Sequence, residues 1–373
     1  MSIFITIVVC FVNLVNLMCK KHKNIPIFLF VILLCVLMGA NTQNPDIENY
    51  ISGFNTERIG PDFGYSILVH FFYFMGFDYE SFRLIISVFG ILLIHQTVKK
   101  FIINKSAFYL LYFIYPFMID IVQIRNFLVM SILIYAVPCL LTQKYRDYIK
   151  FVVYILIAST IQLTAIIYLP IVFLAKAKKN MLIRSILFFN ILGFIIIVAN
   201  KDLFILITNQ ITFMLGEYDN RITKYGFIQT NYGFLLPWAV QLTNFFLVTW
   251  ARKIYSKRLR NEDRSLIGEG NKKFPNKDES IKEKYILLIY WINVYAFLFL
   301  PFYVFQMTFS RFIRNIIPLN LMVFLIAKKR NNNYLFGIIY LSYHIFILCS
   351  YLYWVYPNID INDFFEYNWL IGK

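Results

Sequence analysis

Charged side chains are scarce in this sequence of 373 residues. Asp, Glu, Lys and Arg make up 15% of it, whereas hydrophobic residues make up 60% and the mean hydropathy is +0.63. A soluble domain is only about half apolar. This composition excludes a soluble globular protein and predicts an integral membrane protein.

The motifs of soluble enzymes are also missing. The sequence has no G-x-x-x-x-G-K-[ST], H-E-x-x-H or G-x-S-x-G pattern. Its four histidines are isolated, and its five cysteines lie in or beside apolar runs without a C-x-x-C pair. We therefore expect no cofactor, no metal centre and no disulfide framework. Acidic residues are nearly absent from the middle of the apolar runs, which disfavours an ion pump or transporter.

Cations exceed acids, and the formal net charge is +16. The Lys and Arg residues gather in short polar breaks after every second apolar stretch. This distribution is typical of a polytopic membrane protein, in which Lys and Arg collect on the cytoplasmic side. These breaks are residues 20–23, 99–100, 144–146, 176–179, 251–284 and 328–330. Because the charge is spread over every break and no recognition motif is present, membrane orientation explains it and no nucleic-acid partner is expected.

The apolar stretches predict about twelve membrane crossings, since a span needs roughly 20 mostly apolar residues. The predicted spans are 2–19, 25–40, 79–98, 106–120, 126–143, 148–162, 163–175, 181–199, 235–251, 285–306, 312–327 and 334–354. Residues 2–19 lack a basic start and a small-residue cleavage site, so we expect a retained span and not a signal peptide. The N-terminus and the tail 355–373 then lie outside.

Two segments need separate treatment. Residues 64–76 are apolar but short, and the charge alternation leaves no room for a further crossing, so they predict an interfacial or re-entrant helix on the outer face. Residues 148–175 are long for one helix and short for two. A hairpin that turns at 159–162 keeps every cationic break on the cytoplasmic side, whereas one long tilted helix would invert the predicted orientation of all later spans.

The predicted domain organisation has three parts. Residues 1–250 form an N-terminal transmembrane bundle with outer loops 41–63 and 200–234. Residues 251–284 form a basic cytoplasmic linker, hydrophilic and low in aromatics, which we expect to be flexible. Residues 285–373 form the C-terminal transmembrane helices with an outer tail.

The arginines on the predicted outer side, against the usual distribution, are chiefly Arg125, Arg311 and Arg314. Arg311 and Arg314 are three residues apart and face the same way on a helix. A polyanionic ligand would stabilise such cations, and the planar guanidinium fork suits the phosphate oxygens of a pyrophosphate. The alternative is that they snorkel to the membrane interface.

Other polar residues accompany these arginines on the outer side. Asp46 and Asp62 are either site residues or solvated loop residues. The aromatic residues Tyr50 and Tyr65 can line a substrate site or belong to the interfacial belt. The further candidates for substrate binding are Arg58, Asn126, Gln162 and Arg221.

Taken in order, these clusters resemble the EpsG/Wzy family of bacterial polysaccharide polymerases, over roughly residues 25–345. The matching pieces are the pair Asp46 and Tyr50, the run Asp62-Phe63-Gly64-Tyr65, the turn Ile124-Arg125-Asn126-Phe127 and the run Ser310-Arg311-Phe312. The sequence departs from the family in two places: no arginine precedes Asp46 within 40–45, and Gln162 stands where a histidine is often found.

The resemblance implies an all-α, GT-C-like transmembrane bundle that acts on undecaprenyl-diphosphate-linked oligosaccharides at the outer face of the bacterial cytoplasmic membrane. The growing chain would be transferred from its lipid diphosphate to a hydroxyl of a new repeat unit, without a metal. Arg125, Arg311 and Arg314 would stabilise the leaving diphosphate, and Asp46 or Asp62 would accept the proton of the attacking hydroxyl. A chain-length regulator and a flippase are further candidate partners.

Two other classes of membrane protein remain open. A lipid-linked glycan flippase would carry cations through several spans, which this sequence lacks. A membrane glycan ligase or O-acetyltransferase would share the outer-face chemistry, and the acetyltransferase would add a catalytic histidine motif.

Overall fold

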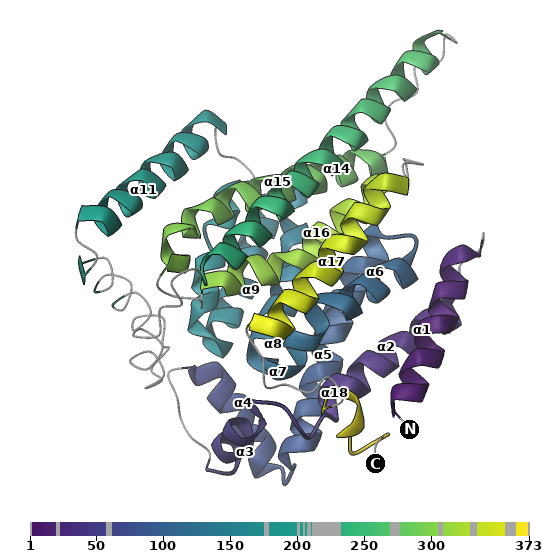
Figure 1. Cartoon of the computed structure of the whole chain (residues 1–373), viewed down its shortest axis with the longest axis vertical. Helices are drawn as coiled ribbons and strands as arrows, with labels where there is room; N and C mark the ends of the chain where they lie inside the picture. The colour runs from purple at the N-terminus through teal and green to yellow at the C-terminus, as the bar shows by residue number, and fades with distance from the viewer. Residues whose placement is uncertain are drawn as a thin grey trace. The chain divides into compact units, whose positions relative to one another are not determined.

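The protein is an all-α membrane protein, shown as a computed structural model in Figure 1. The structure describes residues 2–19, 23–56, 62–174, 179–199, 202–203, 206, 210, 233–268, 277–304, 309–328, 334–354 and 363–371. Within these residues there is no β-strand beyond one isolated bridge between Asn41 and Asn368. The predicted fold class is therefore confirmed.

Among the described residues, five helical segments are long and apolar enough to cross a membrane. They are Tyr79–Phe101, Lys105–Val122, Ile124–Leu141, Asn180–Ala199 and Ser310–Lys328. Shorter apolar helices occupy Ser2–Met18, Asn24–Gly39, Phe63–Phe74, Leu163–Leu174 and Tyr334–Ser350. All ten coincide with segments that hydropathy indicated, but the total of about twelve spans stays a prediction.

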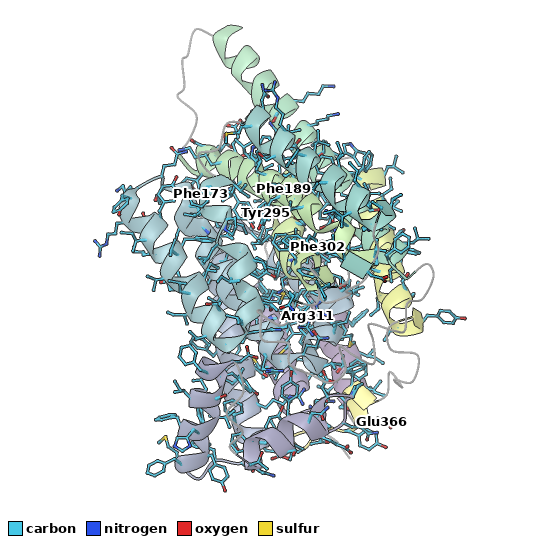
Figure 2. All side chains as sticks on the ribbon, turned by 90° about the vertical axis from the view of Figure 1, so that its left-hand side faces the viewer. Phe173, Phe189, Tyr295, Phe302, Arg311 and Glu366 are labelled. Atoms are coloured by element: carbon cyan, nitrogen blue, oxygen red, sulfur yellow. The ribbon has the colours of Figure 1, made fainter. Side chains whose placement is uncertain are left out.

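Helix α11 (Lys179–Ala199) shows what the lipid-facing surface of this protein looks like. It is mostly apolar, yet only 6% of its apolar part is buried. Phe189, which Figure 2 labels, is 54% exposed and Val198 is 88% exposed. A helix of this kind is stable in lipid, where exposed apolar side chains carry no penalty.

The chain divides into two compact units that interleave along the sequence. Unit 1 comprises Met1–Tyr135, Tyr154–Gln162 and Asn333–Lys373, and unit 2 comprises Ala136–Val153 and Leu163–Asn332. The predicted order of bundle, linker and bundle stays a prediction. Much of the expected linker 251–284 is helical, because α14 (Leu235–Gly268) runs into it and α15 (Lys277–Ala296) begins inside it. Residues 269–276 lie outside the described residues.

In unit 1, α2 packs against α1, α5 and α6. The helices of unit 1 are α1 (Ser2–Met18), α2 (Asn24–Gly39), α3 (Ile47–Asn55), α4 (Phe63–Phe74), α5 (Tyr79–Phe101), α6 (Lys105–Tyr112), α7 (Met118–Val122), α8 (Ile124–Ala136), α17 (Tyr334–Trp354) and α18 (Asp363–Glu366). Helix α4 confirms the expected short helix at 64–76, whereas α3 lies in a segment that we expected to be a loop.

Local sequence explains where α5, which carries part of the site, begins. Asp78 precedes the helix, and its carboxylate accepts a hydrogen bond of 2.9 Å from the backbone N–H of Ser81. This N-cap satisfies one of the free N–H groups of the first turn. Hydrogen bonds from Ser81 hold the pKa of Asp78 below its ordinary value.

The C-terminal segment of unit 1 is attached to the end of α2. The backbone N–H of Trp369 donates to the carbonyl of Ala40 (3.1 Å), and that of Thr42 donates to the carbonyl of Tyr367 (2.9 Å). The side-chain amide of Asn368 donates to the carbonyl of Val36 (2.9 Å). Figure 1 shows α18 beside α1 and the end of α2, although more than 300 residues separate them in sequence.

In unit 2, α14, α15 and α16 (Ser310–Lys328) pack against one another. Three buried asparagines, one from each helix, meet there. The side-chain amide of Asn320 donates to the side-chain oxygens of Asn244 (3.1 Å) and Asn293 (3.2 Å). Unit 2 also contains the turn Val137–Leu141, the 3-10 turn Leu163–Tyr168, α10 (Ile171–Leu174) and α11. Helix α9 (Tyr145–Ile161) contributes residues to both units.

The break expected at 159–162 is present. Helix α9 ends at Ile161, Gln162 is non-helical, and a 3-10 turn begins at Leu163. The prediction that this break is a hairpin between two spans remains a prediction.

Candidate functional site

Arg125 and Asp62 form an ion pair in unit 1. Nη1 of Arg125 lies 2.8 Å from Oδ2 of Asp62. The arginine side chain is 38% exposed, whereas that of the aspartate is 10% exposed. The arginine side chain therefore stays partly exposed, while the carboxylate is largely covered. This geometry is a charge-assisted hydrogen bond, which is stronger than a neutral one.

Two tyrosine rings lie close to the same guanidinium. The central carbon of the Arg125 guanidinium is 5.6 Å from the ring centroid of Tyr50 and 5.5 Å from that of Tyr65. Both distances are within the range of a cation–π interaction. The ring of Tyr50 is in turn stacked on Tyr79, with centroids 6.4 Å apart and ring planes at 8°. The aromatic rings thus fix the arginine and offer flat apolar surfaces beside it.

Arg125 owes its position to a break between two helices. Gln123 has non-helical backbone angles (φ −108°, ψ 65°) and separates α7 from α8. Arg125 is the second residue of α8, in the first turn after the break. Asn126 follows it and is 4% exposed, so it lies inside the packed unit instead of beside the arginine in solvent. The predicted turn Ile124–Phe127 is instead the first turn of α8, directly after the break at Gln123.

Close helix contacts hold this first turn of α8 in place. A Cβ atom on Gly90 of α5 would lie 2.3 Å from the ring of Phe127, two residues after Arg125. Real Cβ atoms do not approach so closely, so only glycine allows α5 to pack against α8 at this point. The glycine in α5 is therefore part of the support of Arg125.

A second close contact holds Asp62 and Tyr65. A Cβ atom on Gly64 of α4 would lie 2.2 Å from the side-chain oxygen of Thr160 near the end of α9. The start of α4 therefore lies against the segment that ends at Gln162. Gln162 is 7% exposed, and its side-chain oxygen has no hydrogen-bond partner among the described residues. A buried amide oxygen of this kind is available to a hydroxyl or water.

Arg83 is a charged residue near this site that sequence reasoning missed. It lies on α5, is 2% exposed, and its guanidinium donates to the carbonyls of Asn41 (3.1 Å) and Ile121 (2.7 Å). The sequence held a signal, since an arginine stands four residues inside an apolar span. Asp120 was also missed as a buried group, and its carboxylate accepts a hydrogen bond of 2.8 Å from Tyr112.

The other predicted arginines belong to unit 2. Arg311 and Arg314 lie in the first turn of α16, and Arg314 is 5% exposed. Beside them the amide of Asn315 donates to the hydroxyl of Tyr168 (2.8 Å), whose ring is stacked on Phe312 at 5.1 Å. Figure 2 labels Arg311 in this unit. The arginine pair is thus accompanied by aromatic rings, as Arg125 is.

The remaining candidates are less closely connected. Asp46 lies at the N-terminus of α3, and its carbonyl accepts a hydrogen bond from the backbone N–H of Tyr50 one turn later (3.1 Å). Arg58 and Arg221 lie outside the described residues. No group of three His, Cys, Asp or Glu side chains that could hold a metal ion occurs in the part of the chain that the structure describes.

The cluster of unit 1, which we call the Arg125 cluster (Tyr50, Asp62, Tyr65, Arg125), has a clear chemical capacity. It combines one partly exposed arginine, a carboxylate that balances its charge, and two aromatic rings beside it. Guanidinium groups bind phosphate oxygens, and aromatic faces pack against apolar faces of ligands. Such a site suits an anionic group attached to a ring.

Neither a curated protein nor a solved structure matches the chain. A family does match it, from Asn24 to Trp369, a range that includes every member of the Arg125 cluster and the arginines of α16. The chain belongs to the EpsG family.

Proposed function

We propose that the protein is a polymerase that joins undecaprenyl-diphosphate-linked oligosaccharide repeat units at the outer face of the bacterial cytoplasmic membrane. Membership of the EpsG family supports a role in polysaccharide polymerisation. The observation that carries the proposal is the partly exposed side chain of Arg125 beside two tyrosine rings. The substrate would be a lipid diphosphate that carries sugars, which supplies both the anion and the rings.

In the proposed reaction Arg125 binds the diphosphate of the growing chain. The bond between the anomeric carbon and the diphosphate oxygen breaks, and the diphosphate keeps the electron pair. A guanidinium that holds two of its oxygens stabilises the charge that develops there. The anomeric carbon forms a new bond with a hydroxyl oxygen of the incoming repeat unit.

Asp62 is the better of the two carboxylates to take the proton of that hydroxyl. It already lies 2.8 Å from Arg125, so the diphosphate must share the guanidinium with it or displace it. Once displaced, the carboxylate regains a free oxygen next to the reacting bond and can act as a general base. Asp46 remains the alternative base, one helical turn from Tyr50.

The other residues have supporting roles in the proposal. Tyr50 and Tyr65 would stack on sugar faces, while Asn126 and Gln162 would bind hydroxyl groups. Arg311 and Arg314 would provide a second anion site in unit 2, and Arg58 and Arg221 would bind substrate from the outer loops. A flippase that delivers the units and a chain-length regulator are the proposed partners.

The central test is Arg125→Lys. Lysine keeps the charge but loses the planar fork, so we expect normal protein in the membrane and a rate lower by about a hundredfold. Cells should accumulate single repeat units on the outer face while long polymer disappears. Arg184→Lys on α11, an exposed arginine in unit 2, is the matched control and should leave polymer unchanged. Near-normal polymer length in Arg125→Lys would refute the assigned role, and repeat units that stay on the inner face would indicate a flippase.

The outward orientation has its own test. A cysteine at Asn55, the last residue of α3, should react with a membrane-impermeant thiol reagent in intact cells. A cysteine at Asn220 should react in the same way, whereas one at Asn271 should react only after lysis; both of these positions lie outside the described residues. Labelling at Asn271 in intact cells would show that the orientation is the reverse of the predicted one and would contradict an active site on the outer face.

A further inference from the structure

Arg83 is a buried cation that lacks an obvious reason to be there. It lies in the membrane-spanning helix α5 with 2% of its surface exposed. Burying a guanidinium in an apolar helix is unfavourable, and a leucine of similar volume would stabilise the packing better. The arginine must therefore provide something that an apolar residue cannot.

The hydrogen bonds of Arg83 show what that is. Nη1 donates to the carbonyl of Asn41 at 3.1 Å, and Nη2 donates to the carbonyl of Ile121 at 2.7 Å. Its Nε has no hydrogen-bond partner among the described residues. Both acceptors are backbone groups near helix ends, where carbonyls lack partners within their own helix. One planar fork thus joins two chain segments that lie 80 residues apart.

One of these segments leads directly to the Arg125 cluster. Ile121 is the penultimate residue of α7, and α8 begins after the single non-helical residue Gln123. Arg125 follows four residues after the carbonyl that Arg83 holds. A break of one residue leaves few backbone angles free, so a shift of the Ile121 carbonyl is passed on to the first turn of α8.

The other segment is itself anchored. Asn41 follows α2 and forms an isolated bridge with Asn368 of the C-terminal segment. Hydrogen bonds on either side, from Trp369 to Ala40 and from Thr42 to Tyr367, fix the backbone there. Arg83 therefore joins the break before Arg125 to a support that the C-terminal segment completes.

We propose that Arg83 is a positioning residue that sets the place of Arg125 through the Ile121 carbonyl, with the 367–369 segment as its fixed support. This inference rests on the proposed function only where activity is measured; the labelling measurement does not depend on it. Lysine cannot replace the arginine fully, because one ammonium does not reproduce the two arms of the fork.

The first experiment does not depend on activity. In a variant without native cysteines, purified in lipid nanodiscs, a cysteine at Gln123 reports the α7–α8 break by its rate of reaction with a thiol reagent. Arg83→Met should raise this rate severalfold, because the carbonyl of Ile121 loses its donor. Arg184→Met on α11, an exposed arginine in unit 2, is the matched control and should leave the rate unchanged. An unchanged rate in Arg83→Met would overturn the proposal.

The second experiment uses synthetic undecaprenyl-diphosphate-linked repeat units. Arg83→Met should lower kcat about tenfold or more, because a small displacement of a catalytic group lowers the reaction rate strongly. The double variant Arg83→Met/Arg125→Lys should be no slower than Arg125→Lys alone, because both act through one group. Multiplicative losses would show that Arg83 acts independently and would overturn the proposal.

Two further variants protect the test against misfolding. Arg83→Lys keeps the charge and should fall between wild type and Arg83→Met in both readouts. Asn368→Ala changes the 367–369 segment and leaves α5 intact, and it should raise the labelling rate of the cysteine at Gln123. An unchanged labelling rate in Asn368→Ala would show that the 367–369 segment does not act as the fixed support of Arg83. If Arg125→Lys retains activity, the proposed function fails while the labelling experiment still decides the role of Arg83.

Discussion

Two polar clusters, one in each unit, are of different kinds. Unit 1 holds charges at helix ends, with Arg125 paired to Asp62 and still 38% exposed. The core of unit 2 holds neutral amides in the middle of helices, where Asn244, Asn293 and Asn320 bond to one another and are each at most 3% exposed. The Arg125 cluster is partly exposed to a ligand, whereas the asparagines of unit 2 satisfy each other's hydrogen-bonding groups.

This difference separates two uses of polar residues in a membrane protein. Amides that bond across helices stabilise packing by modest amounts, about 0.6 kcal/mol per interaction. A charged pair with an accessible face is a weak contributor to packing but a strong binder of an opposite charge. We therefore expect substitutions in the Arg125 cluster to affect activity and substitutions in the asparagine cluster to affect stability.

The largest effect is expected for Asp62→Asn. Asparagine keeps the shape of aspartate but cannot accept a proton, and the loss of a general base typically lowers a rate by about 10²-fold or more. Protein in the membrane should stay normal, as judged by immunoblot, while polymer formation nearly stops. The control is Asp147→Asn, which removes the exposed pair with Lys150 in unit 2 and should have little effect. A near-normal rate in Asp62→Asn would indicate that Asp46, and not Asp62, is the general base.

The next largest effect concerns the helix contacts that hold the Arg125 cluster. Gly90→Ala and Gly64→Ala place a Cβ within 2.3 Å of neighbouring atoms, and overpacking of this kind costs about 1–3 kcal/mol. Both should lower the unfolding temperature in detergent. Gly53→Ala is the matched control, since nothing lies within 4 Å of its added Cβ and alanine favours a helix. Equal stability in all three variants would mean that these contacts do not support the site.

A smaller effect is expected for Asn320→Leu in unit 2. The change removes the amide that bonds to both Asn244 and Asn293, so we expect a loss of about 1–2 kcal/mol of stability. Activity per folded molecule should not change. Asn180→Leu at the exposed start of α11 serves as the control. A fall in specific activity without a change in stability would contradict the distinction between the two clusters.

Much of the fold could be predicted because the membrane imposes a simple rule on the sequence. A span must be long and apolar, so hydropathy located α5, α11 and α16, and the short helix α4 at 64–76 was confirmed. Hydropathy does not locate the helices within 251–284, whose charges predicted a flexible linker, because a polar segment can also be helical, as the end of α14 is.

The site was partly predictable for a different reason. Arg125, Asp62, Tyr50 and Tyr65 stood out as polar or aromatic residues on the expected outer side, and the structure brings them together. Arg83 could have been noticed as an arginine inside an apolar span, but its partners could not be predicted, because they are backbone carbonyls, which every residue has.

The sequence by itself determined that this protein lies in a membrane and where its long apolar helices are. These properties follow from the transfer of single side chains between water and lipid, which depends on composition and order along the chain. The tertiary structure decided which charges meet. Arg125 and Asp62 are 63 residues apart, and their contact depends on two glycines that allow helices to approach and on a buried arginine that joins two helix ends. Contacts of this kind are set by shape and packing in three dimensions, which residue order alone does not specify.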